Sequence, residues 1–234
     1  MAGLGILIAM SKQTIRTKSI PWPLFVSSCL GVVLYICRVL GGGTFRYWYL
    51  VWNLVLAWIP LFFSYMLVRW LKKGRWLSVK GLALTALWLG FLPNSFYLVT
   101  DFIHLAPTGE VGLLFDAVMI MTFAWTGLLL GFISVYMIHS ELQKRVRTRL
   151  SVLLIALVFI LSSFAIYLGR FLTWNTWDII INPAGILFDI SDRVIRPVSY
   201  PSTFTTTTLF SVVLIVLYYT VYKLVAAIKN SAKN

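Results

Sequence analysis

Residues 91–105 read Phe-Leu-Pro-Asn-Ser-Phe-Tyr-Leu-Val-Thr-Asp-Phe-Ile-His-Leu. The stretch begins inside an apolar run and then places Pro93 directly before Asn94. A proline within a helix lacks a backbone donor and clashes with the preceding turn, so we expect a break at Pro93 whose freed carbonyls need partners. Asn94 can supply one, either as a purely structural cap or as part of a binding site. Three polar residues follow the break: Thr100, Asp101 and His104.

The composition places this stretch in a membrane protein. Of 234 residues, 60% are hydrophobic and 12% are charged, and apolar runs of about twenty residues recur, which is typical of a polytopic membrane protein. Six spans are predicted, with bounds near residues 20–40, 47–68, 79–99, 111–138, 150–169 and 204–227. The predicted fold class is therefore all-α integral membrane. One domain occupies residues 20–228, between a cytoplasmic lead at 1–19, for which an interfacial segment is the alternative, and a cytoplasmic tail at 229–234.

The third span is predicted to be interrupted within the bilayer. If the span starts near Ser78, Pro93 lies ~22 Å along it and Asp101 ~34 Å, against a hydrocarbon core of ~30 Å. Broken helices are tolerated where protein or a water-filled cavity covers them. Between spans five and six, residues 179–190 are too short to cross, so we expect an interfacial or re-entrant segment there. We expect this segment to roof a cavity formed by spans three, four and five.

Basic residues are distributed unequally between the two sides of this layout. Fifteen of the twenty Lys and Arg fall at the two termini and in the loops that follow spans two and four. The positive-inside rule then predicts that both termini are cytoplasmic. The net charge of +13 is explained by these basic loops. The basic residues are not interleaved with aromatic residues in a patch of the kind that binds nucleic acid, so no nucleic-acid partner is expected. Six of the seven acidic residues lie on the opposite side, and the polar chemistry is predicted to face outward.

A second polar stretch reaches the same outward side. Residues 169–178 read Gly-Arg-Phe-Leu-Thr-Trp-Asn-Thr-Trp-Asp at the end of span five. Asp116 lies a few residues into span four, where an ionisable residue is costly and indicates a functional site with a partner. Arg170 is a candidate partner for Asp116 and for Asp101. Such a pair is either a substrate contact or a packing device that satisfies its own charges.

Together these side chains form a candidate substrate-binding site. Indole and amide groups beside an arginine resemble a platform for a sugar or a lipid headgroup. For the tryptophans an aromatic belt at the membrane interface is the favoured explanation. The candidate binding residues are Asn94, Tyr97, Thr100, Asp101, His104, Asp116, Arg170, Trp174, Asn175, Trp177 and Asp178.

Catalytic and metal chemistry have weaker support in the sequence. Asp101, His104, Glu110 and Asp116 offer carboxylate and imidazole groups that suit zinc or manganese. Only one histidine lies on that side, however, and no His-Glu-x-x-His pair occurs. The sequence contains no nucleotide-binding loop and no nucleophile elbow. We therefore expect no metal and no cofactor, and no residue is assigned a catalytic role.

Two motifs carry a resemblance to a known family: Leu92-Pro-Asn-Ser-Phe-Tyr-Leu-Val-Thr-Asp101 and Tyr167-Leu-Gly-Arg-Phe-Leu-Thr-Trp-Asn-Thr-Trp-Asp178. Over most of its length the chain resembles the domain-of-unknown-function 1361 family of multi-pass bacterial inner-membrane proteins. The chain departs from the family pattern at Ser95-Phe96, where a small residue and a proline are usual, and at Thr173, where an arginine is usual. The resemblance implies a location in the bacterial cytoplasmic membrane and does not indicate which activity, if any, the protein has. The matching residues are Pro93, Asn94, Tyr97, Thr100, Asp101, Gly169, Arg170, Trp174, Asn175, Trp177 and Asp178.

Three functions are compatible with the sequence. The favoured hypothesis is that the outward polar site binds, and in a wider form moves or modifies, an envelope lipid or a lipid-linked glycan, so that the expected partner is membrane lipid. The first alternative is a structural or accessory subunit whose polar residues pack helices, with another membrane protein as the partner. The second alternative is an intramembrane hydrolase or transferase, which needs a nucleophile or a metal.

Overall fold

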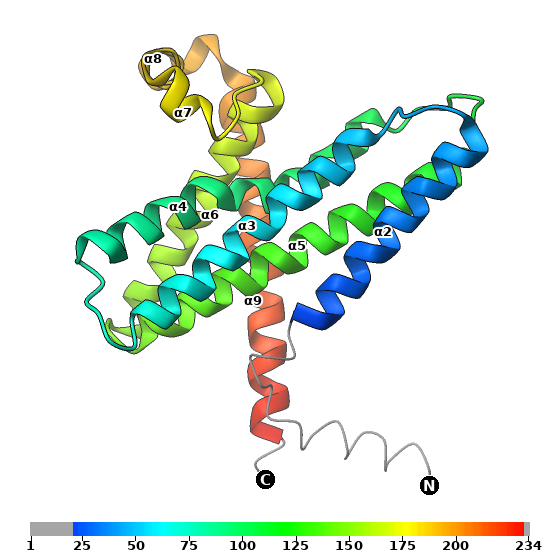
Figure 1. The fold of residues 1–234 in the computed structure, drawn as a ribbon. Coiled ribbons are helices and arrows are strands. Elements are labelled where there is room, and N and C mark those ends of the chain that lie inside the picture. The colour runs from blue at the N-terminus through cyan, green and yellow to red at the C-terminus, as the bar shows by residue number, and fades with distance from the viewer. Residues whose placement is uncertain (1–20, 232–234) are drawn as a thin grey trace, which may run out of the picture.

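The computed structural model describes residues 21–231, so the expectations for residues 1–19 and for the tail beyond Ser231 lie outside the described residues. Six long helices dominate this part of the chain (Figure 1). They are α2 (Pro21–Gly42), α3 (Trp48–Trp70), α4 (Val79–Tyr97), α5 (Leu113–Gln143), α6 (Thr148–Phe171) and α9 (Pro201–Ser231). The shorter elements are the 3₁₀ helix η1 (Leu98–His104), α7 (Asp178–Ile181), α8 (Pro183–Ile195) and the 3₁₀ helix η2 (Pro197–Ser199).

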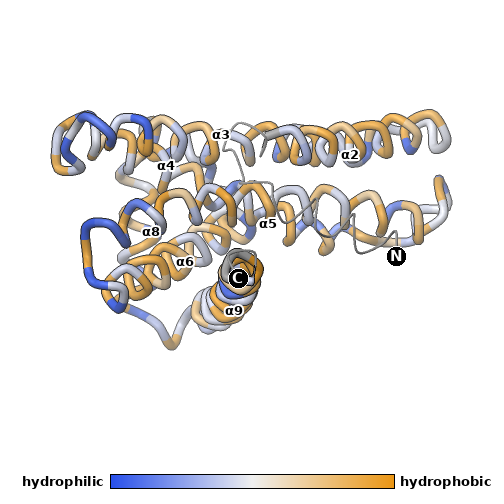
Figure 2. Tube along the Cα trace, turned by 90° about the horizontal axis from the view of Figure 1, so that it is seen from below, coloured by the Kyte–Doolittle hydropathy of each residue, from blue (hydrophilic) through white to orange (hydrophobic). Residues whose placement is uncertain are grey.

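All six long helices are long and apolar enough to cross a membrane. Hydrophobic residues run along each of them, and hydrophilic residues gather in the connections (Figure 2). Between residues 21 and 231 no strand occurs. The predicted all-α, six-span fold class is therefore confirmed, and the protein is a multi-pass membrane protein.

Helix α5 is the centre of the bundle. It packs against α2, α3, α4 and α6, and it is the most buried of the six spans, whereas α9 packs mainly on α6 and is the least buried. Gly127 and Gly131 allow α4 to approach α5 closely: a Cβ atom at Gly127 would lie 2.5 Å from the Ser95 carbonyl oxygen, and one at Gly131 would collide with the Phe96 ring. Small residues four apart commonly mark a close helix crossing in membranes.

The third span is not broken at Pro93, as the sequence predicted, but changes helix type further along. Helix α4 continues through Pro93, and the backbone converts to the 3₁₀ helix η1 at Leu98. Side chains serve the carbonyls of the turn before Pro93: Asn94 Nδ2 donates to the Phe91 carbonyl at 3.0 Å, and Thr176 Oγ1 donates to the Gly90 carbonyl at 3.5 Å. Asn94 thus bonds a carbonyl of this turn, although the carbonyl that lacks a helical donor because of Pro93 is that of Leu89, and the change of helix geometry comes five residues after the proline.

The connection between α6 and α9 folds back over one end of the bundle and contains α7 and α8 (Figure 1). Helix α8 is amphipathic and too short to span. It turns Ile186 and Ile190 toward the bundle and leaves Leu187 and Phe188 exposed. The Trp174 indole Nε1 donates to Asp189 Oδ2 at 2.7 Å, and this bond ties α8 to the end of α6.

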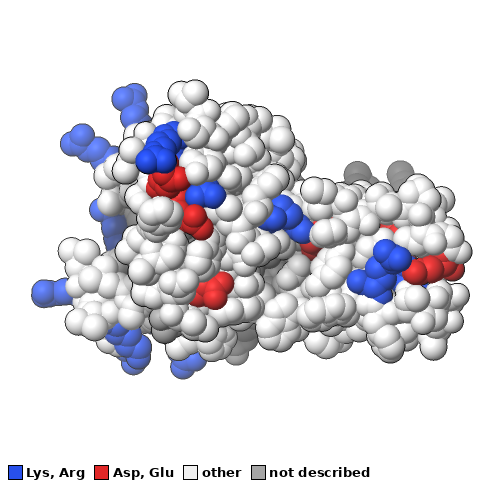
Figure 3. Space-filling view, turned by 90° about the horizontal axis from the view of Figure 1, so that it is seen from above, with Lys and Arg blue, Asp and Glu red and all other residues white. Residues whose placement is uncertain are grey.

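The two ends of the bundle differ in how their charges are paired. We call the end formed by residues 43–47, 98–112 and 172–200, with the adjoining helix turns, the pocket end, and the end formed by residues 71–78 and 144–147, with its adjoining turns, the basic end. Each arginine at the pocket end forms an ion pair with a carboxylate. Figure 3 looks onto the pocket end and shows acidic groups beside basic ones, with other basic groups projecting from the left margin. At the basic end, among residues 21–231, Lys144 and Arg145 alone reach a carboxylate, that of Glu141.

Candidate functional site

A cavity of about 370 Å³ lies at the pocket end, where α3, α4 with η1, and the end of α6 meet beneath α7 and α8. Its size is within the range of small-ligand sites. The predicted roof is present, because Ile179, Ile186 and Ile190 line the cavity. The predicted walls need one correction: α5, the fourth span, contributes no lining residue, and α3 takes its place. The reason is that α4 presses its other face against Gly127 and Gly131 of α5.

Arg170 joins the two motifs in one wall of this cavity. It lies in the last turn of α6, and each of its three side-chain nitrogens donates a hydrogen bond. Nη2 lies 2.5 Å from Asp101 Oδ1, Nε donates to Thr100 Oγ1 at 2.9 Å, and Nη1 donates to His104 Nε2 at 2.8 Å. The guanidinium also lies 4.3 Å from the centre of the Tyr97 ring, a cation–π arrangement. The motifs therefore meet, and all but a small part of Arg170 is covered.

The charge of this wall is balanced. Asp101 is fully buried, and its second oxygen accepts a hydrogen bond from Asn53 Nδ2 at 3.3 Å. Because a guanidinium can only donate, His104 Nε2 must be the unprotonated acceptor of the Arg170 bond. One cation and one anion, both held by hydrogen bonds, give the wall strong local dipoles and no net charge.

Asp116 lies apart from the cavity, and its partner is not Arg170. In the first turn of α5, its Oδ1 lies 3.3 Å from Nε of Arg38, a fully buried side chain on α2. Arg38 also pairs with Glu110 and donates to Thr44. The sequence places Arg38 near the end of a span without showing which helix it faces. The packing of α2 on α5 decides the pair.

The remaining predicted residues divide into two groups. Asn94, Trp174 and Asn175 line the cavity together with Tyr97, Asp101, His104 and Arg170. Thr100 contributes through its bonds to Arg170. Trp177 and Asp178 do not line the cavity: Trp177 is exposed, and Asp178 Oδ2 accepts a hydrogen bond from the Asn175 backbone nitrogen at 2.7 Å, which closes the turn before α7.

A comparison with protein families identifies the chain. A family model described as "Protein of unknown function (DUF1361)" matches residues 52–229. The chain belongs to the DUF1361 family. No curated protein matches it, and no solved structure does. The match contains both motifs and all of α4 to α8, so the Arg170–Asp101 wall lies within the family region, whereas Arg38 lies outside it.

Within this DUF1361 protein, α3 supplies residues that the sequence analysis missed. Tyr49, Trp52 and Asn53 line the cavity opposite α6. Tyr49 packs edge-on against the His104 ring, with the ring centres 5.3 Å apart, and its buried hydroxyl has no hydrogen-bond partner within residues 21–231. One signal pointed to this helix, since Asn53 is an isolated amide within an apolar span, a position that costs free energy unless a partner is present. Its partner is Asp101.

The wall of the cavity consists mainly of hydrogen-bonding and aromatic groups. Among residues 21–231, no group of three His, Cys, Asp or Glu side chains is placed to hold a metal ion. The wall of this DUF1361 protein instead offers amide, hydroxyl and indole groups around a neutral ion pair. Such groups recognise the hydroxyls of a polar ligand through hydrogen bonds and its apolar faces through ring stacking.

Proposed function

We propose that the cavity binds the headgroup of a membrane amphiphile, either an envelope lipid or a lipid-linked glycan. One observation carries the proposal: a single cavity has a polar wall around Arg170 and Asp101 and an apolar roof formed by Ile179, Ile186 and Ile190. A fully polar solute would leave the apolar roof without a matching contact. A molecule with a polar head and a hydrocarbon tail can contact the polar wall with its head and the apolar roof with its tail.

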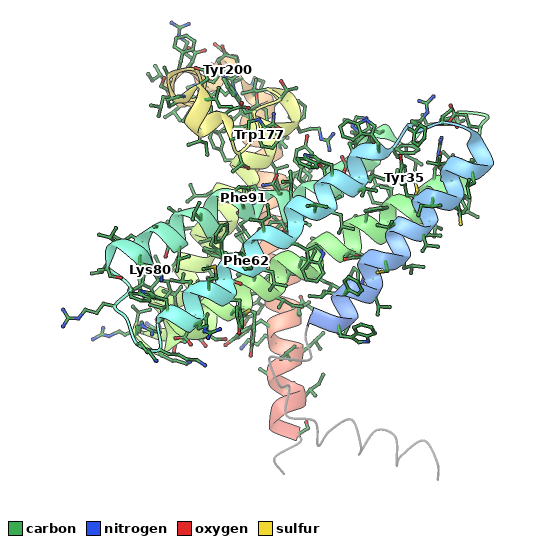
Figure 4. All side chains as sticks on the ribbon, in the orientation of Figure 1. Tyr35, Phe62, Lys80, Phe91, Trp177 and Tyr200 are labelled. Atoms are coloured by element: carbon green, nitrogen blue, oxygen red, sulfur yellow. The ribbon has the colours of Figure 1, made fainter. Side chains whose placement is uncertain are left out.

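The outer side of the roof supports an amphiphile as the ligand. Leu187 and Phe188 of α8 are exposed, as are Ile181, Val194 and Ile195 in the same segment. A short helix with such a surface favours a position in the headgroup region of a bilayer. A roof lying there gives a lipid tail a lateral path along the membrane while the head occupies the cavity. Figure 4 shows Trp177, at the start of this segment, and Tyr200, at its end.

The side of the membrane follows from the basic end. Positive residues concentrate there, and the positive-inside rule assigns that end and both termini to the cytoplasm. The proposed cavity then opens toward the outer leaflet of the bacterial cytoplasmic membrane.

The headgroup class follows from the balanced wall. Because Asp101 already balances the charge of Arg170 and four of the five guanidinium N–H groups are engaged by Thr100, Asp101 and His104, this wall offers an anionic head one donor and no net positive charge. A neutral head rich in hydroxyls does not need such a charge. It can donate to the carbonyl oxygen of Asn94, whose Nδ2 is occupied by the Phe91 carbonyl and by Thr176, and it can stack on Trp52. A glycan head therefore fits better than a phosphate alone.

The test compares two tryptophans on one helix. Trp52 lines the cavity and is 47% exposed, whereas Trp48, one turn away, does not line it and is 61% exposed. Lipids and lipid-linked precursors would be measured in cells lacking the protein and in cells restored at matched level with the parent, Trp52→Ala, Arg170→Ala or Trp48→Ala. We expect one species to change in the null strain and to remain changed with Trp52→Ala and Arg170→Ala, while Trp48→Ala restores it. A null strain with an unaltered lipid profile would contradict the proposal.

An accessory subunit is the second candidate, and the pairing of Arg170 with Asp101 favours it, because a charge cluster that is neutralised within the chain can serve packing alone. Asp101→Asn separates the two. A binding site predicts an altered lipid profile even when this variant is expressed to the abundance of the parent, as measured by quantitative immunoblotting of membranes. A packing cluster predicts that the lipid profile is restored once the abundance is matched.

A further inference from the structure

A second cavity, of about 520 Å³, lies at the basic end between the last two turns of α3 and the start of α4. Its apolar part is formed by Phe62, Met66 and Leu84. Its polar part is formed by three cations, Arg69, Lys73 and Lys80. Phe62 and Lys80 are labelled in Figure 4.

None of these three cations has a carboxylate partner within residues 21–231, in contrast to every arginine at the pocket end. The ammonium of Lys80 lies 4.8 Å from the centre of the Trp70 ring, which is its only charge-related contact in that part of the chain. Three like charges around one hollow repel one another. An anion placed among them removes that repulsion and gains three attractions.

The wall that carries the cations is held in a fixed shape. Trp70 donates from Nε1 to Ser78 Oγ at 3.2 Å, and the Gly74 nitrogen donates to the Trp70 carbonyl at 2.8 Å. A Cβ atom at Gly74 would collide with the Trp70 indole, so only glycine lets the turn after α3 lie flat on this ring. The indole therefore forms a rigid side of the cavity, and Lys80 is positioned above it.

We propose that this cavity binds an anionic phospholipid, with the headgroup phosphate among Arg69, Lys73 and Lys80 and an acyl chain along Phe62 and Met66. Phe62 is 59% exposed and lies seven residues before Arg69 on the same helix, roughly 10 Å deeper at 1.5 Å per residue. A free phosphate compound would contact the cations and leave the apolar surface of Phe62 and Met66 uncovered. A phospholipid can contact both the cations and this apolar surface. Basic hollows between membrane helices are a known mode of anionic-lipid recognition.

The test uses purified protein in a neutral detergent, titrated with phosphatidylglycerol and followed by the midpoint of thermal unfolding. The variant that removes the three cations of the cavity, called the groove variant below, is Arg69→Gln/Lys73→Gln/Lys80→Gln. The control variant, Lys72→Gln/Arg75→Gln/Arg149→Gln, removes three exposed charges from the same end and leaves the cavity intact. Phosphatidylcholine with the same acyl chains and glycerol phosphate without chains are the two comparison ligands.

We expect phosphatidylglycerol to stabilise the parent and the control variant at similar concentrations. Its apparent affinity for the groove variant should fall by roughly fivefold for each cation removed, as about 1 kcal/mol per cation at an anionic surface implies. If the triple substitution prevents purification, Lys73→Gln and Lys80→Gln singly test the same dependence, since both side chains are exposed.

Three results would overturn the assignment. Equal losses in the groove and control variants would mean that general charge attracts the lipid. Equal stabilisation by phosphatidylcholine would mean that the phosphate group without net charge suffices. Stabilisation by glycerol phosphate as strong as that by phosphatidylglycerol would assign the cavity to a soluble phosphate compound. The proposal concerns the end opposite the amphiphile cavity, so neither proposal depends on the other.

Discussion

The pocket end and the basic end both carry arginine, yet they use it differently. At the pocket end Arg38 and Arg170 are buried or nearly so, and each is paired with a carboxylate on another helix, Asp116 and Asp101 respectively. At the basic end Arg69 projects into a cavity with no carboxylate near it in the described chain. Paired arginines hold helices together at defined positions, whereas unpaired ones remain available to outside anions. The comparison teaches that pairing decides what a basic residue offers a ligand: the paired Arg170 belongs to a neutral hydrogen-bonding wall, whereas the unpaired Arg69 offers a net positive charge.

The largest effect is expected from Arg38→Met. This change leaves the buried Asp116 carboxylate without a counter-charge, and breaking a buried pair typically costs about 3–5 kcal/mol. Thermal unfolding in detergent should show a strongly destabilised protein. The double variant Arg38→Met/Asp116→Leu should recover part of the loss, because it removes the stranded charge. If Arg38→Met were as stable as the parent, the paired arginines of the pocket end would not have the structural role that the comparison gives them.

A smaller effect is expected from Arg170→Lys. Lysine keeps the charge but loses the forked geometry that reaches Asp101, Thr100 and His104 together, as well as the contact over Tyr97. We expect the free energy of unfolding to fall by about 1–3 kcal/mol. Arg46→Lys is the matched control, because Arg46 is half exposed and pairs with Glu110 alone. Its unfolding midpoint should stay close to that of the parent.

Acid should weaken the pocket end through Glu110. Hydrogen bonds from Arg46, Arg38 and Thr44 lower the pKa of Glu110 from its usual 4.5 to about 2. A carboxyl group whose pKa is depressed on folding stabilises above its unfolded pKa and loses that contribution as pH falls toward its folded pKa. The stability difference between the parent and Glu110→Gln should therefore be present at pH 6 and shrink between about pH 4.5 and pH 2. A pH-independent difference would show that Glu110 acts by packing.

The smallest effect is expected at the basic end. Lys72→Gln and Arg75→Gln remove exposed charges that have no carboxylate partner in the described residues, and surface changes of this kind usually stay within about 0.5 kcal/mol. Unfolding midpoints measured without added lipid should match that of the parent. A large loss in either variant would mean that this end also contains a structural charge cluster.

Much of the fold followed from one-dimensional features of the sequence. Apolar length located all six spans within a few residues, and the polar groups of the two motifs pointed to the end where Arg170 meets Asp101. The rotation of each helix about its own axis, which decides the neighbour that each side chain faces, could not be predicted from these features. Gly127 and Gly131 turn α5 toward α4, so α3 instead of α5 faces the cavity, and Asp116 faces Arg38. Hydropathy averages over the faces of a helix, and these contacts depend on single faces.

The position of Asp101 has a consequence for how the chain is made. Its cation, Arg170, follows 69 residues later, which at about 5–20 residues per second is a delay of roughly 3–14 seconds during synthesis. For that interval the counter-ion of Asp101 has not yet been synthesised. A carboxylate in the middle of a span would be stranded in hydrocarbon while it waited. Asp101 lies in η1, close to the end of its span, where water can hydrate it until α6 is inserted and delivers the arginine.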